Sequence, residues 1–277
     1  MERKEQATVG RQLSTGFFQY GSLALVGAAA LSAWFVCEIR DGGRRWQTRC
    51  EAPGNIRPDS WEDAGPCAPD ETGMSFHFLP DPEIFVDTSW DNTILMNWLW
   101  EQVHLYPGLA ITFTDEHDCC GPQTFCAPDG LHEMLPWCLE DKTLIHSTII
   151  TGAGMHQGVQ VELVLVFTQD DPTWRIYGCG LPLEDGGTPL TGLRTGLSRT
   201  LGKLAGCTGI SFQPDKARLG VAAIVSVWTD KPVFGGPARQ KLDNPEAEVA
   251  VAQIVHDALL THANQYPDEM QAILAAL

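Results

Sequence analysis

The stretch GVAAIVSVWTDKPVFGGPARQKLDNPEAEVAV, residues 220–251, predicts a strand, a loop and the start of a helix in order. Its apolar run at 221–228 is rich in β-branched residues and predicts a buried strand. Pro245 directly after Asn244 predicts the start of a helix, with Asn244 as its N-cap. Residues 233–244, between them, carry two glycines, a proline and two cations. That composition is typical of a loop built to hold an anion.

Outward from this stretch, the chain alternates between strand-like and helix-like segments, a pattern that favours an α/β or α+β protein. We expect an α+β fold. Strands are predicted at 34–41, 72–81, 109–116 and 158–169, the last paired with 174–180, and a hairpin turn at 41–43. Helices are predicted at 23–33, 91–105, 131–139, 191–206 with a glycine stop, and 267–277, and a loop at 53–70.

The bulk composition limits the possible functions of the 277-residue chain. Hydrophobic residues make up 44%, enough for a packed core. The formal net charge of −17 argues against DNA binding as the main role, because phosphate is bound by lysine and arginine. The nine cysteines, with no signal-peptide pattern before them, are expected to be reduced thiols in a cytoplasmic protein.

One N-terminal stretch allows a different interpretation. No charged residue occurs between Gln12 and Cys37, and the run at 17–36 is about long enough to span a bilayer. Polar residues such as Gln19 and Ser32 dilute the run, so a buried helix followed by a strand is the favoured interpretation. We therefore expect no membrane contact and keep a membrane-anchored protein as an alternative.

Three stretches together resemble one family. LSAWFVCEIRDGGRRWQTRCEAPG at 31–54, followed by GMSFHFLPDPEIF at 73–85, resembles the second half of the ATPase domain of DNA gyrase B. EDGGTPLTGLRTGLSRTLGKLAG at 184–206 resembles the acidic-Gly-Gly-Thr turn and arginine-bearing helix of its transducer domain. Residues 220–251 resemble the transducer's switch loop and the helix after it. The ATPase subunit of topoisomerase IV has the same layout, and the sequence does not separate the two.

The resemblance implies a two-part architecture. Residues 1–115 would be the C-terminal half of a GHKL-type ATPase sandwich, and 116–277 a transducer of the ribosomal-protein-S5-domain-2-like fold. It also implies ATP and Mg²⁺ as the cofactors of the family. Gyrase or topoisomerase IV subunits would be the partners, and DNA would be contacted only indirectly.

The family's catalytic positions are poorly matched in this chain. The glutamate base, the magnesium-binding asparagine and the adenine-reading aspartate would precede the matched region, and no Glu-Gly-Asp-Ser cleavage motif occurs. The family's glycine-rich phosphate loop falls on Gly21, Ser22, Leu23 and Ala24, with one glycine left. We therefore expect no cofactor for this chain alone, no ATP hydrolysis and no DNA cleavage by it.

The switch loop also departs from the family's catalytic pattern. Where the family has Gln-Thr-Lys, this chain has Pro237, Ala238 and Arg239, and Lys241 matches the family's second lysine. Proline removes a backbone donor, and a planar guanidinium does not replace a compact ammonium. We expect the loop to keep its shape and lose its chemistry. Gly21, Ser22 and Arg239 remain the candidates for any phosphate contact.

Arg194 and Arg199 match family arginines that can face the cavity through which DNA passes. A solvated helix face is the alternative, and the strongly negative charge favours it.

A second group, His117, Cys119, Cys120 and Cys126, has residue types that suit zinc. Two adjacent cysteines fit one tetrahedral site poorly, so we expect no metal. His256 and His262 lie on the long helix after residue 245 and are expected to serve packing.

The sequence therefore predicts a truncated, degenerate relative of the gyrase B or topoisomerase IV ATPase subunit. It would act as a non-catalytic partner or regulatory fragment. Two alternatives stay open: one half of a split ATPase subunit completed by another chain, with Arg239 acting in trans, or a remnant without activity.

Overall fold

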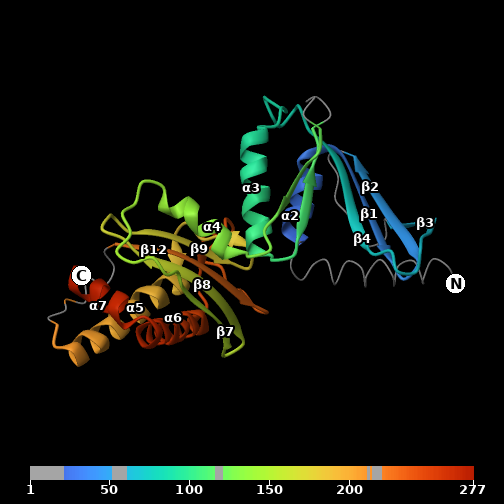
Figure 1. Cartoon of the computed structure of the whole chain (residues 1–277). Helices are drawn as coiled ribbons and strands as arrows, with labels where there is room; N and C mark the ends of the chain where they lie inside the picture. Colours follow the sequence, from blue (N-terminus) through green and yellow to red (C-terminus); the bar gives the residue numbers. More distant parts are fainter. Residues whose placement is uncertain (1–21, 52–60, 116–120, 211–212, 214–219) are drawn as a thin grey trace. The chain divides into compact units, whose positions relative to one another are not determined.

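The computed structural model describes residues 22–51, 61–115, 121–210, 213 and 220–277 (Figure 1). The chain forms two compact units, Met1–Asp91 and Asn92–Leu277, and each is described by itself. Helices and strands are mixed throughout, so the predicted α+β class is confirmed. The domain boundary expected at 115/116 from the resemblance stays a prediction.

The first unit contains helix α2 and one antiparallel sheet. α2 (Ser22–Ala30) leads into a sheet of four strands in the order β3-β2-β1-β4. The strands are β1 (Ser32–Asp41), β2 (Arg44–Glu51), β3 (Glu62–Pro66) and β4 (Gly73–Pro80). Gly42 and Gly43 both adopt positive φ between β1 and β2, so the predicted hairpin is confirmed.

Strand β3 corrects the prediction of a continuous loop at 53–70. Its sequence, EDAGP, has low β propensity. The strand forms because β2 offers it partners: Arg44 forms an ion pair with Asp63, and Arg45 donates to the Ala64 carbonyl. Tertiary pairing here overrides local preference.

The core of this unit lies on one face of β1. Phe35, Cys37 and Ile39 alternate along the strand and are buried, together with Ala29 of α2 and Trp61. We call Phe35, Cys37 and Ile39 the β1 core row.

Strand β4 continues the same face at the end of the sheet order. Phe78, Phe76 and Met74 stand opposite the β1 core row in the antiparallel register. They keep 40%, 41% and 48% of their surface exposed. The apolar face of the sheet therefore extends beyond the packed core.

The second unit is built on a five-stranded sheet in the order β10-β9-β12-β8-β7. Its strands are β7 (Ile150–His156), β8 (Val159–Phe167), β9 (Thr173–Gly178), β10 (Leu181–Pro182) and β12 (Val221–Thr229). The predicted pairing of 174–180 with 158–169 is wrong, because β12 lies between these strands, parallel to β9 and antiparallel to β8. β12 is almost wholly apolar and buried, which suits a central strand.

Strand β7 was not predicted. Its sequence ITGAGMH contains two glycines, which weaken strand propensity. The glycines allow helix α6 to approach: a Cβ at Gly152 or Gly154 would lie 2.9 or 2.8 Å from Ile254. Close packing against α6 therefore explains why this strand carries glycines, which have low strand propensity.

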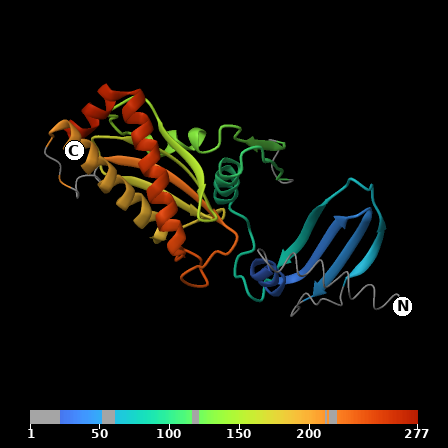
Figure 2. The same ribbon diagram turned by 90° about the horizontal axis from the view of Figure 1, so that it is seen from below.

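Helices cover both faces of this sheet (Figures 1 and 2). One face packs against α5 (Thr188–Thr208), α6 (Pro245–Gln265) and α7 (Pro267–Ala276). The other packs against α4 (Leu131–Met134), the 3-10 helix η1 (Leu135–Leu139) and the end of α3 (Asn92–Leu105). Alternate residues of β8 pack into the cores on the two faces. Leu163 and Leu165 face α5, α6 and α7, and Val164 and Val166 face the other side.

Helices α5 and α6 lie side by side, and glycine makes this possible. A Cβ at Gly192 would collide with the Glu248 carbonyl oxygen, and one at Gly196 would lie 2.8 Å from Val255. The predicted stop at Gly206 is wrong: α5 continues to Thr208 and ends at Gly209, which adopts the left-handed conformation at φ 72°.

The remaining strands are short. β5 (Ala110–Phe113) and β6 (Gln123–Cys126) form an antiparallel pair, and β11 (Gly186–Gly187) pairs in parallel with β13 (Lys241–Leu242). Of the described helices, none is both long enough and apolar enough to cross a bilayer. The described part of the apolar run at 17–36 is the nine-residue α2 followed by the start of β1.

Candidate functional site

The loop between β12 and α6, residues 230–244, is the first candidate site, and we call it the β12–α6 loop. Its second half is fixed to the turn before α5 through the β11–β13 pair. The Asp185 N–H donates to the Gln240 carbonyl at 3.0 Å, and the Gln240 amide donates to Glu184 at 2.8 Å. A Cβ at Gly187 would collide with the Leu242 carbonyl oxygen, so this turn requires glycine.

Asn244 joins the two ends of the loop. Its Oδ1 accepts the Val233 N–H at 2.7 Å, and its Nδ2 donates to the Lys231 carbonyl at 3.0 Å. The residue stands at the predicted N-cap position of α6, but its side chain makes no capping hydrogen bond. Because Asn244 is 4% exposed, both hydrogen bonds are shielded from water.

Three backbone donors of the loop bond to carbonyls within it. The Gly235 N–H donates to the Lys241 carbonyl at 2.9 Å, and the Asp243 N–H donates to the Val233 carbonyl at 2.8 Å. The Arg239 N–H donates to the Gly236 carbonyl at 3.2 Å, and Pro237 has no N–H. A phosphate cradle presents such donors to its ligand. These three donors are already used within the loop and are not available to a nucleotide phosphate.

Arg239 and Lys241 are held by neighbours within the loop. The Arg239 guanidinium lies 5.6 Å from the centre of the Phe234 ring, and Arg239 itself has a φ of 56°. The Lys241 ammonium lies 2.8 Å from a carboxylate oxygen of Asp243, which raises the pKa of Lys241. Both side chains reach solvent, so these contacts are weak.

The other predicted phosphate contacts lie in the first unit. Ser22 is the first residue of α2, and Gly21 lies outside the described residues. Their role stays a prediction, like that of Pro237, Ala238 and Arg239.

The two predicted DNA-facing arginines point in different directions. Arg194 is half-buried, with its guanidinium 5.3 Å from the ring centre of Trp174 on β9. Arg199 is exposed and lines a hollow of about 290 Å³ between α5 and α6, with Lys203 and Glu248. Five residues of helix turn a side chain by about 140°, so these arginines do not share one surface.

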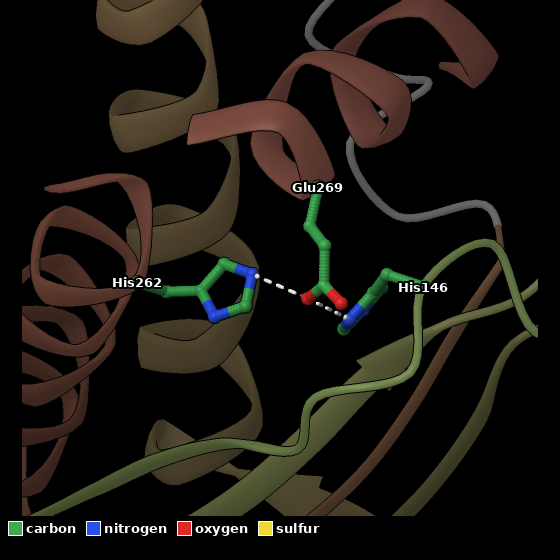
Figure 3. A group of neighbouring side chains, drawn as sticks. All are labelled: His146, His262 and Glu269. Carbon is green, nitrogen blue, oxygen red and sulfur yellow. Dashed lines mark ion pairs between the residues drawn. The ribbon is translucent and has the colours of Figure 1, made fainter. Parts of the chain in front are cut away.

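The second candidate site is a group of three side chains from three elements, drawn in Figure 3. His146 precedes β7, His262 lies near the end of α6, and Glu269 lies in the first turn of α7. Glu269 Oε2 is 3.5 Å from His146 Nδ1 and 3.4 Å from His262 Nε2. These three polar atoms are buried and lack a well-aligned hydrogen bond. We call the group the His–Glu–His cluster.

The other oxygen of Glu269 is well satisfied. Oε1 accepts hydrogen bonds from the Ser147 hydroxyl at 3.0 Å, the Thr148 hydroxyl at 3.1 Å and the Ser147 N–H at 3.4 Å. Burial acts to raise the pKa of Glu269, but these bonds outweigh it and hold that pKa below its usual range. A negative charge in the first turn of a helix is also favoured by the helix dipole.

Two imidazoles and a carboxylate are groups that can bind a metal ion, but the hydrogen bonds of the cluster oppose that role. A metal-bound histidine donates its other ring N–H to an acceptor. The other nitrogen of His146, Nε2, instead accepts the buried Phe167 N–H at 2.9 Å. Its proton must therefore be on Nδ1, the atom that faces the cluster. The His–Glu–His cluster does not fit a metal ion.

Both histidines are held toward the neutral form. Burial lowers the pKa of His146, with a further contribution from His262, and together these outweigh the opposing effect of Glu269. Burial likewise lowers the pKa of His262, against Glu269. His262 was expected to serve packing and is 4% exposed, whereas His146 and Glu269 were not singled out. No local motif marks them, since more than a hundred residues separate His146 from its partners.

The predicted zinc-type group cannot be placed as a set. Cys126 ends β6 and is exposed, and His117, Cys119 and Cys120 lie outside the described residues.

Comparison with known proteins gives a consistent result. A family model described as DNA gyrase B matches residues 130–277. The DNA gyrase B protein of Thermus thermophilus is 31% identical over 266 residues, which is 91% of this chain and 41% of that protein. The DNA gyrase B protein of Haloferax lucentense is 29% identical over 255 residues, which is 89% of this chain and 40% of that protein.

Solved structures agree with the fold. The 43K ATPase domain of Thermus thermophilus gyrase B, solved with an aminocoumarin, matches 89% of this chain and 68% of its own at a TM-score of 0.71 and 29% identity. The ATP-binding domain of Francisella tularensis topoisomerase IV matches the same shares at a TM-score of 0.75 and 22% identity. The chain spans about two fifths of the length of the curated relatives named above.

Proposed function

The chain belongs to the DNA gyrase B family, and on that premise we propose that it is a non-catalytic partner of a type II DNA topoisomerase. It docks on a gyrase or topoisomerase IV subunit in the cytoplasm, chiefly through its second unit. It contributes no catalytic group to ATP hydrolysis and contacts DNA only indirectly. ATP and Mg²⁺, which the family uses in general, bind to the partner.

One observation carries the proposal: the β12–α6 loop keeps an ordered shape in which backbone donors are used internally and Pro237 supplies none. Asn244 and the β11–β13 pair hold both ends of the loop. The N–H groups of Gly235, Arg239 and Asp243 are used within the loop. A loop that only decayed would not be expected to retain this internal bonding, so the shape supports a retained docking or signalling role.

The first experiment is isothermal titration calorimetry on the purified full chain with Mg²⁺ and a non-hydrolysable ATP analogue. We expect no nucleotide binding by the chain alone. Titration of the chain into full-length gyrase B from the same source is expected to give saturable heat. Nucleotide binding by the chain alone would overturn the non-catalytic assignment. No heat on mixing would overturn the partner assignment and leave a remnant.

A second candidate is one half of a split ATPase subunit, and the sheet of the first unit favours it. β4 ends the strand order in the described residues, and it carries the half-exposed Met74 and Phe78 beside the packed β1 core row. A strand edge with an apolar face is a surface that another chain can extend. In that case Arg239 would reach a phosphate bound by the other chain.

The variant Arg239→Ala separates the two candidates. In ATPase assays of the mixed assembly, the non-catalytic partner predicts an unchanged rate, because Arg239 contacts no phosphate. The split enzyme predicts a rate loss of about a hundredfold or more, as for removal of a donor aimed at transition-state charge. Lys241→Ala is the matched control, a neighbouring cation bound to Asp243.

A further inference from the structure

The His–Glu–His cluster lies outside every element of the proposed function and is the strongest unexplained feature of the second unit. It joins three segments: the stretch before β7, the end of α6 and the start of α7. It sits beside an open hollow of about 520 Å³ lined by residues 144–147 and by Asp268, Glu269 and Ala272. Solvent in this hollow can exchange protons with the buried groups.

We infer that His146, His262 and Glu269 form a proton-dependent latch, which docks α7 while both imidazoles are neutral and loosens it as they take up protons. α7 is a ten-residue helix, and its Glu269 carboxylate is its polar connection to the segment before β7. Met270, Ile273 and Leu274 complete its attachment through the apolar core. Release therefore means a larger opening equilibrium for α7, with the sheet remaining folded.

The neutral state of His146 is set by geometry. Nε2 accepts the Phe167 N–H, so Nδ1 carries the hydrogen that faces Glu269. A second proton could enter only at Nε2, where it would meet the Phe167 N–H and break that bond. Proton uptake at His146 therefore leaves a buried backbone donor without its acceptor, which is unfavourable.

His262 completes the latch from α6. Its Nε2 faces the same Glu269 oxygen, and its ring centre lies 5.4 Å from that of His146. Two imidazolium groups there would share one carboxylate in a buried site, leaving an uncompensated positive charge.

Other groups also face the cluster from the elements around it. Tyr266 contributes a ring 5.2 Å from that of His262, and Asp268 lines the adjacent hollow. From β8 come the Phe167 N–H and a ring 5.9 Å from that of His146. Within the described part of the chain, the two imidazoles are the ion-pair partners of Glu269.

The direction of the pH effect follows from proton linkage. Both histidines have a lowered pKa in the docked state, so the loosened state binds more protons below the ordinary histidine value. Docking is then complete above about pH 6.5 and weakens as the pH falls through the docked pKa values. The lowered pKa of Glu269 means that its contribution is lost only at still lower pH, so the range from pH 5 to 7 reports the imidazoles.

The test is hydrogen–deuterium exchange of the full chain between pH 5 and 8, corrected for the intrinsic exchange rate. We expect the protection factors of residues 267–276 to fall with pH, by about tenfold per pH unit for one proton and up to about a hundredfold for two. Peptides of α5 are expected to keep their protection and serve as the internal reference. A flat profile for α7 would overturn the latch.

Variants assign the effect to the cluster. His262→Gln keeps a polar side chain that does not titrate, and we expect it to reduce the pH slope of α7 protection. Glu269→Gln is expected to lower α7 protection at pH 7.5 and to flatten its slope. His256→Gln is the matched control, because His256 lies on the same helix but hydrogen-bonds to Thr200, 2.9 Å away. A wild-type slope in His262→Gln would contradict the proposal.

The same samples test the metal alternative without any variant. Exchange is repeated at pH 7.5 with added Zn²⁺ and, separately, with EDTA. The latch predicts the same α7 protection in all three solutions. Protection that rises with Zn²⁺ or falls with EDTA would show a metal site and overturn the proton latch.

Discussion

The two ends of helix α6 differ in how their polar groups are hydrogen-bonded. At its N-terminal end, the β12–α6 loop reaches solvent, yet the N–H groups of Gly235, Arg239 and Asp243 are bonded within the loop. At its C-terminal end, the His–Glu–His cluster is buried, yet three of its polar atoms lack well-aligned partners. Exposure to solvent is therefore a poor guide to where chemistry remains possible. A satisfied loop is a structural element, whereas an unsatisfied buried cluster responds to protons.

The largest loss of stability is expected when the base of the β12–α6 loop is disturbed. Gly187→Ala places a Cβ against the Leu242 carbonyl oxygen at a φ of 84°, so the β11–β13 pair must separate. We expect a loss of about 3 kcal/mol or more in the free energy of unfolding, measured by urea denaturation. Gly206→Ala is the matched control, because a Cβ there meets nothing within 4 Å. It is expected to be neutral or stabilising by up to about 1 kcal/mol, and equal losses in both variants would contradict the steric argument.

The next largest effect is expected at Asn244, which ties the loop ends together. Asn244→Ala removes the acceptor of Val233 and the donor to Lys231, both shielded from water. We expect a loss of about 2–4 kcal/mol by urea denaturation, since each unpaired buried group costs about 1–3 kcal/mol. Asn244→Asp keeps the acceptor and should lose less. Equal losses would show that the Val233 bond contributes nothing.

The smallest effect is expected at Lys241, an exposed cation of the loop. Lys241→Ala removes an ion pair with Asp243 that solvent screens. We expect no measurable shift in the thermal midpoint at physiological salt. A clear loss would show that the loop's order depends on its charges, and the contrast between the two ends of α6 would then be weaker.

Sequence patterns anticipated the regular elements and missed the long-range contacts. The β1–β2 hairpin, β12 and the start of α6 follow from local signals: Gly42 and Gly43, a β-branched run and Pro245 after Asn244. β7 was missed because Gly152 and Gly154 look unlike a strand until α6 is placed against them. The strand order was mistaken because proximity in sequence favoured pairing β8 with β9, whereas burial places β12 between them.

The candidate sites show the same division. The β12–α6 loop was predicted because Pro237 and Arg239 occupy a recognisable local stretch. The His–Glu–His cluster could not be predicted, because its members come from three elements and no spacing connects them. Single histidines near helix ends are common, and only the fold brings Glu269 between these two.

The glycines that let α6 pack closely have a further consequence. Gly152 and Gly154 on β7, and Gly192 and Gly196 on α5, face the middle of this 21-residue helix, which is about 31 Å long. Each residue inserted there would turn everything beyond it by about 100° relative to the sheet and carry His262 and Glu269 away from His146. The rotation of α6 residues about the helix axis is therefore constrained as strictly as the length of the helix. A single-residue insertion or deletion between residues 249 and 258 would disrupt the cluster even where the added side chain faced solvent.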